Sequence, residues 1–64
     1  MKKYKVSEII RMLEADGWYL KDQKGSHCHF VHDARGGKVT VNGKPGDVLD
    51  QFLLNSIFKQ AGWK

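Results

Sequence analysis

Glycine and proline residues cut this chain into five short pieces, which limits it to short helices and strands joined by tight turns. Glycine adopts backbone angles that other residues avoid, and proline interrupts helices and central strands. The breaks fall at Gly17, Gly25, the pair Gly36 and Gly37, Gly43 with Pro45 and Gly46, and Gly62. With 64 residues in all, we expect one domain over residues 1–64. A domain of this size buries only about 60% of its unfolded surface, so its core must be small.

The first and last pieces have the periodicity of amphipathic helices. The first carries apolar residues at helical spacing: Val6, Ile9, Ile10 and Leu13. Ser7 is its candidate N-cap and Gly17 ends it. The last carries a broader apolar stripe: Leu49, Phe52, Leu53, Leu54, Ile57, Phe58 and Ala61. This second helix is predicted to begin at Asp47 or Asp50 and to end at Gly62.

Three extended segments lie between the helices. The first runs from Trp18 towards Lys24, the second from His27 to about His32, and the third covers residues 38–41, an alternating stretch rich in β-branched residues. Tight turns at residues 24–26 and 33–37 separate them. The sequence therefore predicts an α+β fold of order α-β-β-β-α, with a three-stranded antiparallel sheet and two helices packed on one face.

Side chains alternate between the two faces of a strand, and this assigns the chemistry-bearing residues. The core face takes the apolar residues Cys28, Phe30, Val39 and Val41. The open face takes the polar residues His27, His29, Lys38 and Thr40. His32 falls on the side of Cys28 at a strand end, which favours a structural or a solvated position over a place in the site.

Charge favours an anionic partner. The chain has 11 Lys+Arg against 7 Asp+Glu, a net charge of +4, and nucleic acid is the first anionic partner to consider for such a domain.

One cysteine excludes an internal disulfide. The sequence shows neither a signal peptide nor an apolar run of membrane-spanning length, so we expect a cytoplasmic protein without a membrane partner.

Metal binding is the rival interpretation of the segment that holds His27, Cys28, His29 and His32. Strand alternation places His27 and His29 on one face and the other two on the opposite face. A catalytic zinc ion usually takes three protein ligands, so we expect no metal and no cofactor.

Several stretches together resemble one family, the HicA (YcfA-type) toxins of bacterial and archaeal toxin–antitoxin pairs. They are the helix followed by Asp16-Gly17-Trp18, the segment Gly25-Ser26-His27-Cys28-His29-Phe30, the strand Lys38-Val39-Thr40-Val41, and the ending Ser56-Ile57-Phe58-Lys59-Gln60-Ala61-Gly62. The resemblance covers nearly the whole chain in the family's order. The chain departs from the family at residues 42–46 and at Phe52-Leu53, where many members carry a Pro/His-containing stretch and a Gly-Thr helix start.

The resemblance implies a double-stranded-RNA-binding-domain-like fold and a toxin that cleaves messenger RNA and so arrests translation and growth. Its catalytic histidine is the one directly after Gly-Ser, which is His27, and its motif glycine is Gly25. It also implies a cognate HicB-type antitoxin, so we expect a monomer alone and a hetero-oligomer with the antitoxin.

RNA cleavage without a metal uses the substrate's own 2′-hydroxyl as nucleophile. Histidine suits the proton transfers because its ordinary pKa lies near neutrality. We therefore assign acid/base catalysis to His27, and proton transfer or RNA contact to His29. The remaining candidates for RNA binding or charge stabilisation are Lys24, Gly25, Ser26, Lys38 and Lys44.

A non-catalytic module that binds RNA or a protein is the alternative, because a fold does not fix a function. Double-stranded-RNA binders rely on shape and phosphate contacts. Asp47 and Asp50 at the start of the second helix would repel phosphate there, which favours cleavage over passive binding.

Overall fold

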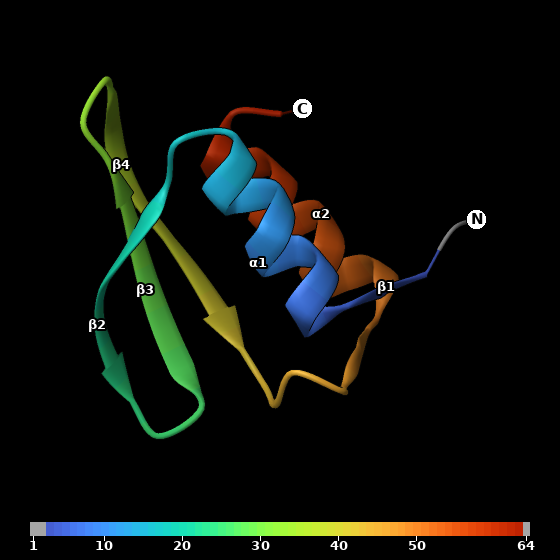
Figure 1. The fold of residues 1–64 in the computed structure, drawn as a ribbon. Coiled ribbons are helices and arrows are strands. Elements are labelled where there is room, and N and C mark those ends of the chain that lie inside the picture. The colour runs from blue at the N-terminus through green and yellow to red at the C-terminus, as the bar shows by residue number, and fades with distance from the viewer. Residues whose placement is uncertain (1–2, 64) are drawn as a thin grey trace.

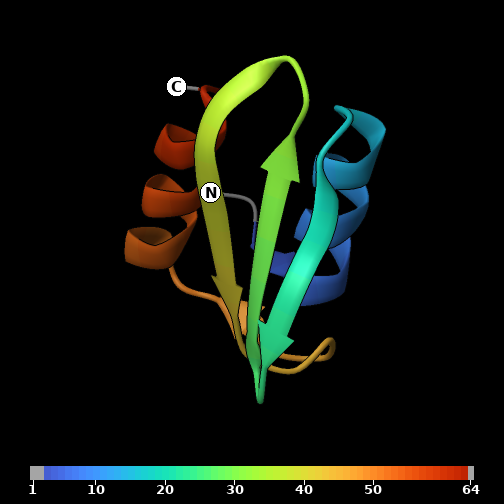
Figure 2. The same cartoon turned by 90° about the vertical axis from the view of Figure 1, so that its left-hand side faces the viewer.

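The computed structural model describes residues 3–63, so the two ends of the expected domain, residues 1–2 and 64, lie outside the described residues. Its elements follow the chain in this order: β1 (Tyr4–Lys5), α1 (Val6–Ala15), β2 (Tyr19–Lys24), β3 (His27–His32), β4 (Arg35–Asn42), β5 (Val48–Leu49) and α2 (Gln51–Ala61) (Figure 1). Strands β2, β3 and β4 form an antiparallel sheet in that order. Both helices lie on the same side of it, as Figures 1 and 2 show together. The predicted α-β-β-β-α architecture is confirmed.

A second, two-stranded sheet was not predicted. Strand β1 pairs antiparallel with β5, with Tyr4 opposite Leu49 and Lys5 opposite Val48. Strands of two residues carry too little alternation to be recognised in a sequence. This pairing ties the start of α1 to the segment before α2.

The N-termini of the two helices correct one prediction and decide between the alternatives of another. Helix α1 begins at Val6, and the Glu8 carboxylate accepts a hydrogen bond of 2.9 Å from the Lys5 backbone N–H. Ser7 therefore lies inside the first turn and is not the N-cap. Helix α2 follows Asp50, whose Oδ1 accepts a hydrogen bond of 2.8 Å from the Leu53 backbone N–H. Asp50, and not Asp47, is the cap of this helix.

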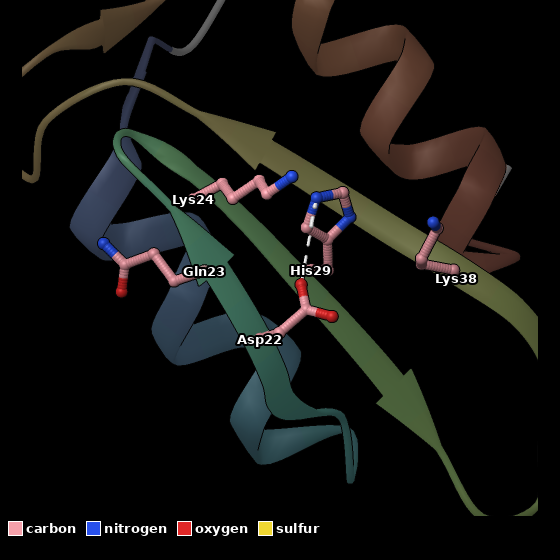
Figure 3. A pocket seen from close by; sticks show the side chains of 5 residues that line it. All are labelled: Asp22, Gln23, Lys24, His29 and Lys38. Atoms are coloured by element: carbon pink, nitrogen blue, oxygen red, sulfur yellow. Dashed lines mark ion pairs between the residues drawn. The ribbon is translucent and has the colours of Figure 1, made fainter.

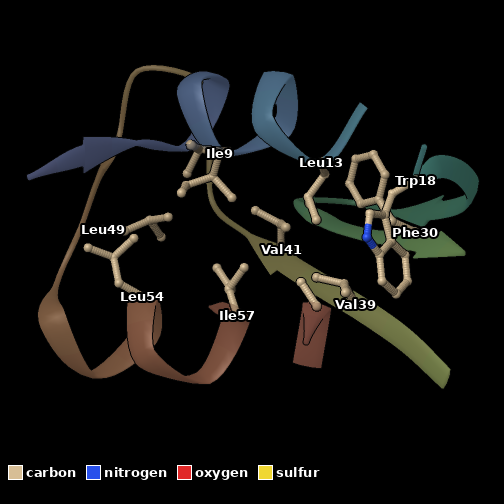
Figure 4. Close-up of a cluster of buried hydrophobic side chains, with 11 residues drawn as sticks. Ile9, Leu13, Trp18, Phe30, Val39, Val41, Leu49, Leu54 and Ile57 are labelled. Carbon is tan, nitrogen blue, oxygen red and sulfur yellow. The ribbon is translucent and has the colours of Figure 1, made fainter. Parts of the chain in front are cut away.

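The core lies between the helices and the inner face of the sheet (Figure 4). Its buried residues are Val6, Ile9, Leu13, Trp18, Phe30, Val39, Val41, Leu49, Leu54, Ile57 and Ala61. The apolar stripe predicted for α2 is wrong at three positions: Phe52 is 81% exposed, Leu53 is 37% exposed, and the buried Leu49 lies in β5 and not in the helix. The buried positions of α2 recur at three- and four-residue intervals from Leu54, and Phe52 in the first turn falls outside that stripe.

The turn between β3 and β4 is tighter than predicted. His32 pairs with Arg35, so only Asp33 and Ala34 separate the strands. Gly36 and Gly37 lie inside β4, where the register with β3 is irregular. Gly37 has a φ of 85°, a backbone angle that favours glycine. The glycine pair therefore shapes a strand irregularity and not the turn.

Candidate active site

The open face of the sheet, opposite the helices, carries the predicted polar side chains. His27 and His29 both belong to β3; His27 is exposed and His29 is partly buried. Lys24 of β2 lies directly opposite His27, and Thr40 of β4 lies opposite His29. Directly opposed residues of an antiparallel pair point to the same face with Cβ atoms about 5 Å apart. The sheet therefore brings Lys24 beside His27.

A two-residue turn positions His27 at the exposed end of β3. Gly25 has a φ of 56°, and glycine at the first central position is typical of the tight hairpin turns that match strand twist. A Cβ added at Gly25 would meet no described atom within 4 Å, so the glycine is required by its backbone angle and not by crowding. The Ser26 carbonyl accepts a hydrogen bond of 3.1 Å from the Gly43 backbone N–H, which joins the turn to the end of β4.

A β-bulge at Lys21 decides which residues of β2 reach the open face. Leu20 pairs with Phe30 on the core side, and the next pair is Asp22 with His29, so Lys21 is the extra residue. Strict alternation from Leu20 would place Lys21 on the open face and Asp22 on the core face. The bulge shifts the pattern by one residue, and Asp22 and Lys24 both face the histidines.

These side chains surround a pocket of about 430 Å³ on the open face, lined by Asp22, Gln23, Lys24, His29 and Lys38 (Figure 3). Nδ1 of His29 lies 3.3 Å from the Thr40 hydroxyl, and its Nε2 lies 4.0 Å from Oδ1 of Asp22. Side chains from both neighbouring strands therefore flank the ring and hold its orientation.

Of the predicted site residues, Lys24, His29 and Lys38 come together in this pocket, while His27, Gly25 and Ser26 lie at the adjoining turn. Lys44 is not among the lining residues. It is exposed in the segment after β4, where its backbone N–H donates a hydrogen bond of 2.9 Å to the carboxylate of Asp47.

Asp22 and Gln23 are the two lining residues that the sequence analysis did not predict, and Asp22 is the charged one. A signal was available, since counting back from the Gly25-Ser26 turn pairs Lys24 with His27 and therefore Asp22 with His29. Alternation counted from the apolar Leu20 instead places Asp22 on the core face. The two counts agree only if β2 contains a bulge between Leu20 and Asp22.

His32 has a structural role, as its predicted face suggested. Its Nε2 lies 2.7 Å from the Asp16 carbonyl, its Nδ1 accepts a hydrogen bond of 3.0 Å from the Ala34 backbone N–H, and its ring packs edge-on against Trp18. Because Nδ1 accepts a hydrogen bond, the neutral ring carries its proton on Nε2, and this N–H donates a hydrogen bond to the backbone carbonyl of Asp16. Within residues 3–63, no three His, Cys, Asp or Glu side chains gather closely enough to hold a metal ion.

Across the described part of the chain, neither helix is long and apolar enough to cross a membrane.

None of the curated proteins compared with this chain matches it. A family model does match: HicA toxin of bacterial toxin-antitoxin systems, over residues 6–63. The match includes every element from α1 to α2, together with the turn and pocket of the open face. The chain therefore belongs to the HicA family of toxins.

Proposed function

We propose that this toxin is an endoribonuclease that cleaves messenger RNA and that His27 is its catalytic residue. One observation carries the proposal: His27 is exposed at the end of β3, directly opposite Lys24, on the face of the sheet that the helices leave open. A histidine beside a lysine supplies both a proton-transfer group and a positive charge for a phosphate.

The proposed reaction needs only the groups of this face and the substrate's own 2′-hydroxyl. His27 withdraws the 2′-proton, the 2′-oxygen attacks the neighbouring phosphorus, and the bond from phosphorus to the 5′-oxygen breaks. The leaving 5′-oxygen takes up a proton, which the protonated His27 or the nearby His29 can donate. The products are a 2′,3′-cyclic phosphate and a free 5′-hydroxyl. Lys24 stabilises the extra negative charge on the phosphoryl oxygens in the transition state.

A cognate antitoxin belongs with a toxin of this family, and we propose that a HicB-type antitoxin inhibits by covering the open face. The described cations of this face, Lys24 and Lys38, suit an acidic partner surface. In this proposal the free toxin is a cytoplasmic monomer, and the inhibited form is a hetero-oligomer in which RNA cannot reach His27.

A non-catalytic RNA-binding module is the rival function. Such a module gains affinity from phosphate groups at helix N-termini, where backbone N–H groups point outwards. Here the carboxylate of Asp50 already accepts the Leu53 N–H at the start of α2, and the exposed side chain of Phe52 follows it. This helix start is poorly suited to phosphate, and the open face remains the better RNA site.

Cleavage of end-labelled single-stranded RNA in excess EDTA tests the proposal. We expect the wild-type chain to cut and His27→Ala to leave the RNA intact. Lys24→Met should cut more slowly, whereas Lys59→Met, which removes an exposed lysine from α2, should cut like wild type. Equal cutting by wild type and His27→Ala would refute the role of His27. If no RNA is cut even with ribosomes present, and induction leaves growth unaffected, the ribonuclease function itself is wrong.

A further inference from the structure

A carboxylate in the pocket sets it apart from a simple phosphate site. Asp22 lies among Lys24, Lys38 and His29, and its side chain is 66% exposed, so it is open to a ligand. A carboxylate repels a phosphate but accepts hydrogen bonds from N–H groups. The pocket therefore offers an acceptor and several donors side by side, which is the pattern of a site that reads the edge of a nucleobase.

We propose that this pocket binds one unpaired guanine base of the RNA, with Asp22 as the residue that determines specificity. Guanine presents two N–H donors side by side, N1–H and the 2-amino group, and a carboxylate can accept from both at once. Adenine and cytosine each present one amino group, and uracil presents one imino N–H, so each forms a single hydrogen bond with Asp22. Lysine donates to O6 and N7 of guanine, and this is the role that the proposal gives to Lys38.

Two features of the sheet support this site. The Lys21 bulge places Asp22, and not the basic Lys21, opposite His29. The Thr40 hydroxyl lies 3.3 Å from Nδ1 of His29 and Oδ1 of Asp22 lies 4.0 Å from its Nε2, so each ring nitrogen has a polar neighbour beside the pocket. An aromatic ring placed in this way offers a surface on which a base can stack.

The pocket also lies at the right place for a nucleotide next to the cut bond. His27 and His29 are two residues apart on one strand, about 7 Å along it. Lys24 lines the pocket and at the same time lies opposite His27. A guanosine in the pocket would therefore present its adjoining phosphate to Lys24 and His27. This inference rests on the proposed ribonuclease function, since it assigns the pocket to the same substrate.

The test measures binding without cleavage. The probes are fluorescent five-nucleotide RNAs with 2′-O-methyl groups, which cannot supply a nucleophilic hydroxyl, and they differ only in a central guanine, hypoxanthine, adenine or cytosine. For the intact chain we expect the guanine probe to bind about tenfold more tightly than the adenine and cytosine probes. Hypoxanthine, which lacks the 2-amino group, should fall between them.

Asp22→Asn should reduce the preference for guanine to about twofold or less, because the amide presents donors where the base also presents donors. Asp33→Asn is the matched control, since it removes the same charge from the β3–β4 turn, and it should keep the full preference. Equal affinity for all four probes, or tighter binding of all four by Asp22→Asn, would show a phosphate site and overturn the inference. Failure of every probe to bind would overturn it as well. Because no probe can be cut, loss of the guanine preference and loss of cleavage are separate results.

Discussion

Asp16 accepts a hydrogen bond of 3.0 Å from the indole N–H of Trp63, which follows it by 47 residues in the chain. The same carboxylate oxygen accepts the indole N–H of Trp18 at 3.1 Å, and the second oxygen lies 3.5 Å from the guanidinium of Arg35. One side chain thereby joins the end of α1, the residue before β2, the start of β4 and the segment after α2.

This arrangement predicts an acid-sensitive contribution to stability. The hydrogen bond from Trp63, the one from Trp18 and the charges of Arg35 and His32 lower the pKa of Asp16 below its ordinary 3.8, against the opposing effect of partial burial. The unfolded chain therefore binds a proton more readily than the folded one, and folding stability rises with pH across this range. The contribution is present above about pH 3.8 and is lost as pH falls through the lower pKa of the folded state.

Thermal unfolding of wild type and Asp16→Asn between about pH 7 and about pH 2 measures this contribution. The wild type should be the more stable at neutral pH, and the difference should shrink below about pH 3.8. Asp33→Asn provides the comparison for loss of one exposed carboxylate. If the stability of wild type and of Asp16→Asn changed with pH by the same amount, Asp16 would not be the source of the acid-sensitive contribution.

The hairpin turn before His27 predicts a sharp difference between two glycine substitutions. Gly25→Ala places a Cβ in the left-handed region at a φ of 56°, which costs about 1 kcal/mol of stability. Gly36→Ala meets equally open space but needs no positive φ, so its unfolding free energy should stay close to the wild-type value. Urea unfolding of both variants makes the measurement, and an equal loss in the two would show that the turn conformation is not the cause.

The two histidines at the ends of β3 should behave in opposite ways. His32→Ala leaves the Asp16 carbonyl and the Ala34 N–H without their partner and removes the contact with Trp18, so we expect a loss of about 2 kcal/mol. His27→Ala changes an exposed side chain and should alter stability by less than about 0.5 kcal/mol. Denaturant unfolding compares them, and a large loss in His27→Ala would make its inactivity uninformative about catalysis.

Much of the fold could be predicted because its signals are local. The spacing of Ile9 and Leu13 defines one helix, and the alternation of Val39 and Val41 defines a buried strand face. The β1–β5 pair could not be predicted, since the contact between Tyr4 and Leu49 joins distant residues through strands too short for a pattern. Apolar spacing also mispredicted Phe52, because apolar character alone does not decide which side of a helix faces the core.

The candidate site was predicted in part for the same reason. His27 and His29 follow from alternation along β3, and Lys38 follows from its place next to the buried Val39. Asp22 depends on the bulge, which changes the pattern within one strand and leaves its trace only in the conflict between Leu20 and the Gly25 turn. Irregular positions of this kind must be located in three dimensions, and here the bulge at Lys21 turns Asp22, the residue that we assign to base recognition, to the open face.

The bulge predicts opposite results for two single-residue deletions in β2. Deleting Lys21 removes the extra residue and leaves Leu20 opposite Phe30 and Asp22 opposite His29 in a regular ladder. Deleting Gln23 also gives a regular ladder, but with the turn pairing fixed it places Lys21 opposite His29 and moves Asp22 to the core side. Both variants lose one residue from the same strand, so each is a control for the other.

We expect the Lys21 deletion to keep the roughly tenfold preference for the guanine probe and the Gln23 deletion to lose it. Proton NMR contacts between position 29 and its β2 neighbour would identify which residue lies opposite His29 in each variant. Loss of preference in both deletions, with Asp22 still opposite His29 in the first, would show that bulge geometry matters to binding beyond placing the carboxylate. Retention of the preference in the Gln23 deletion, with Lys21 opposite His29, would exclude Asp22 as the residue that reads the base.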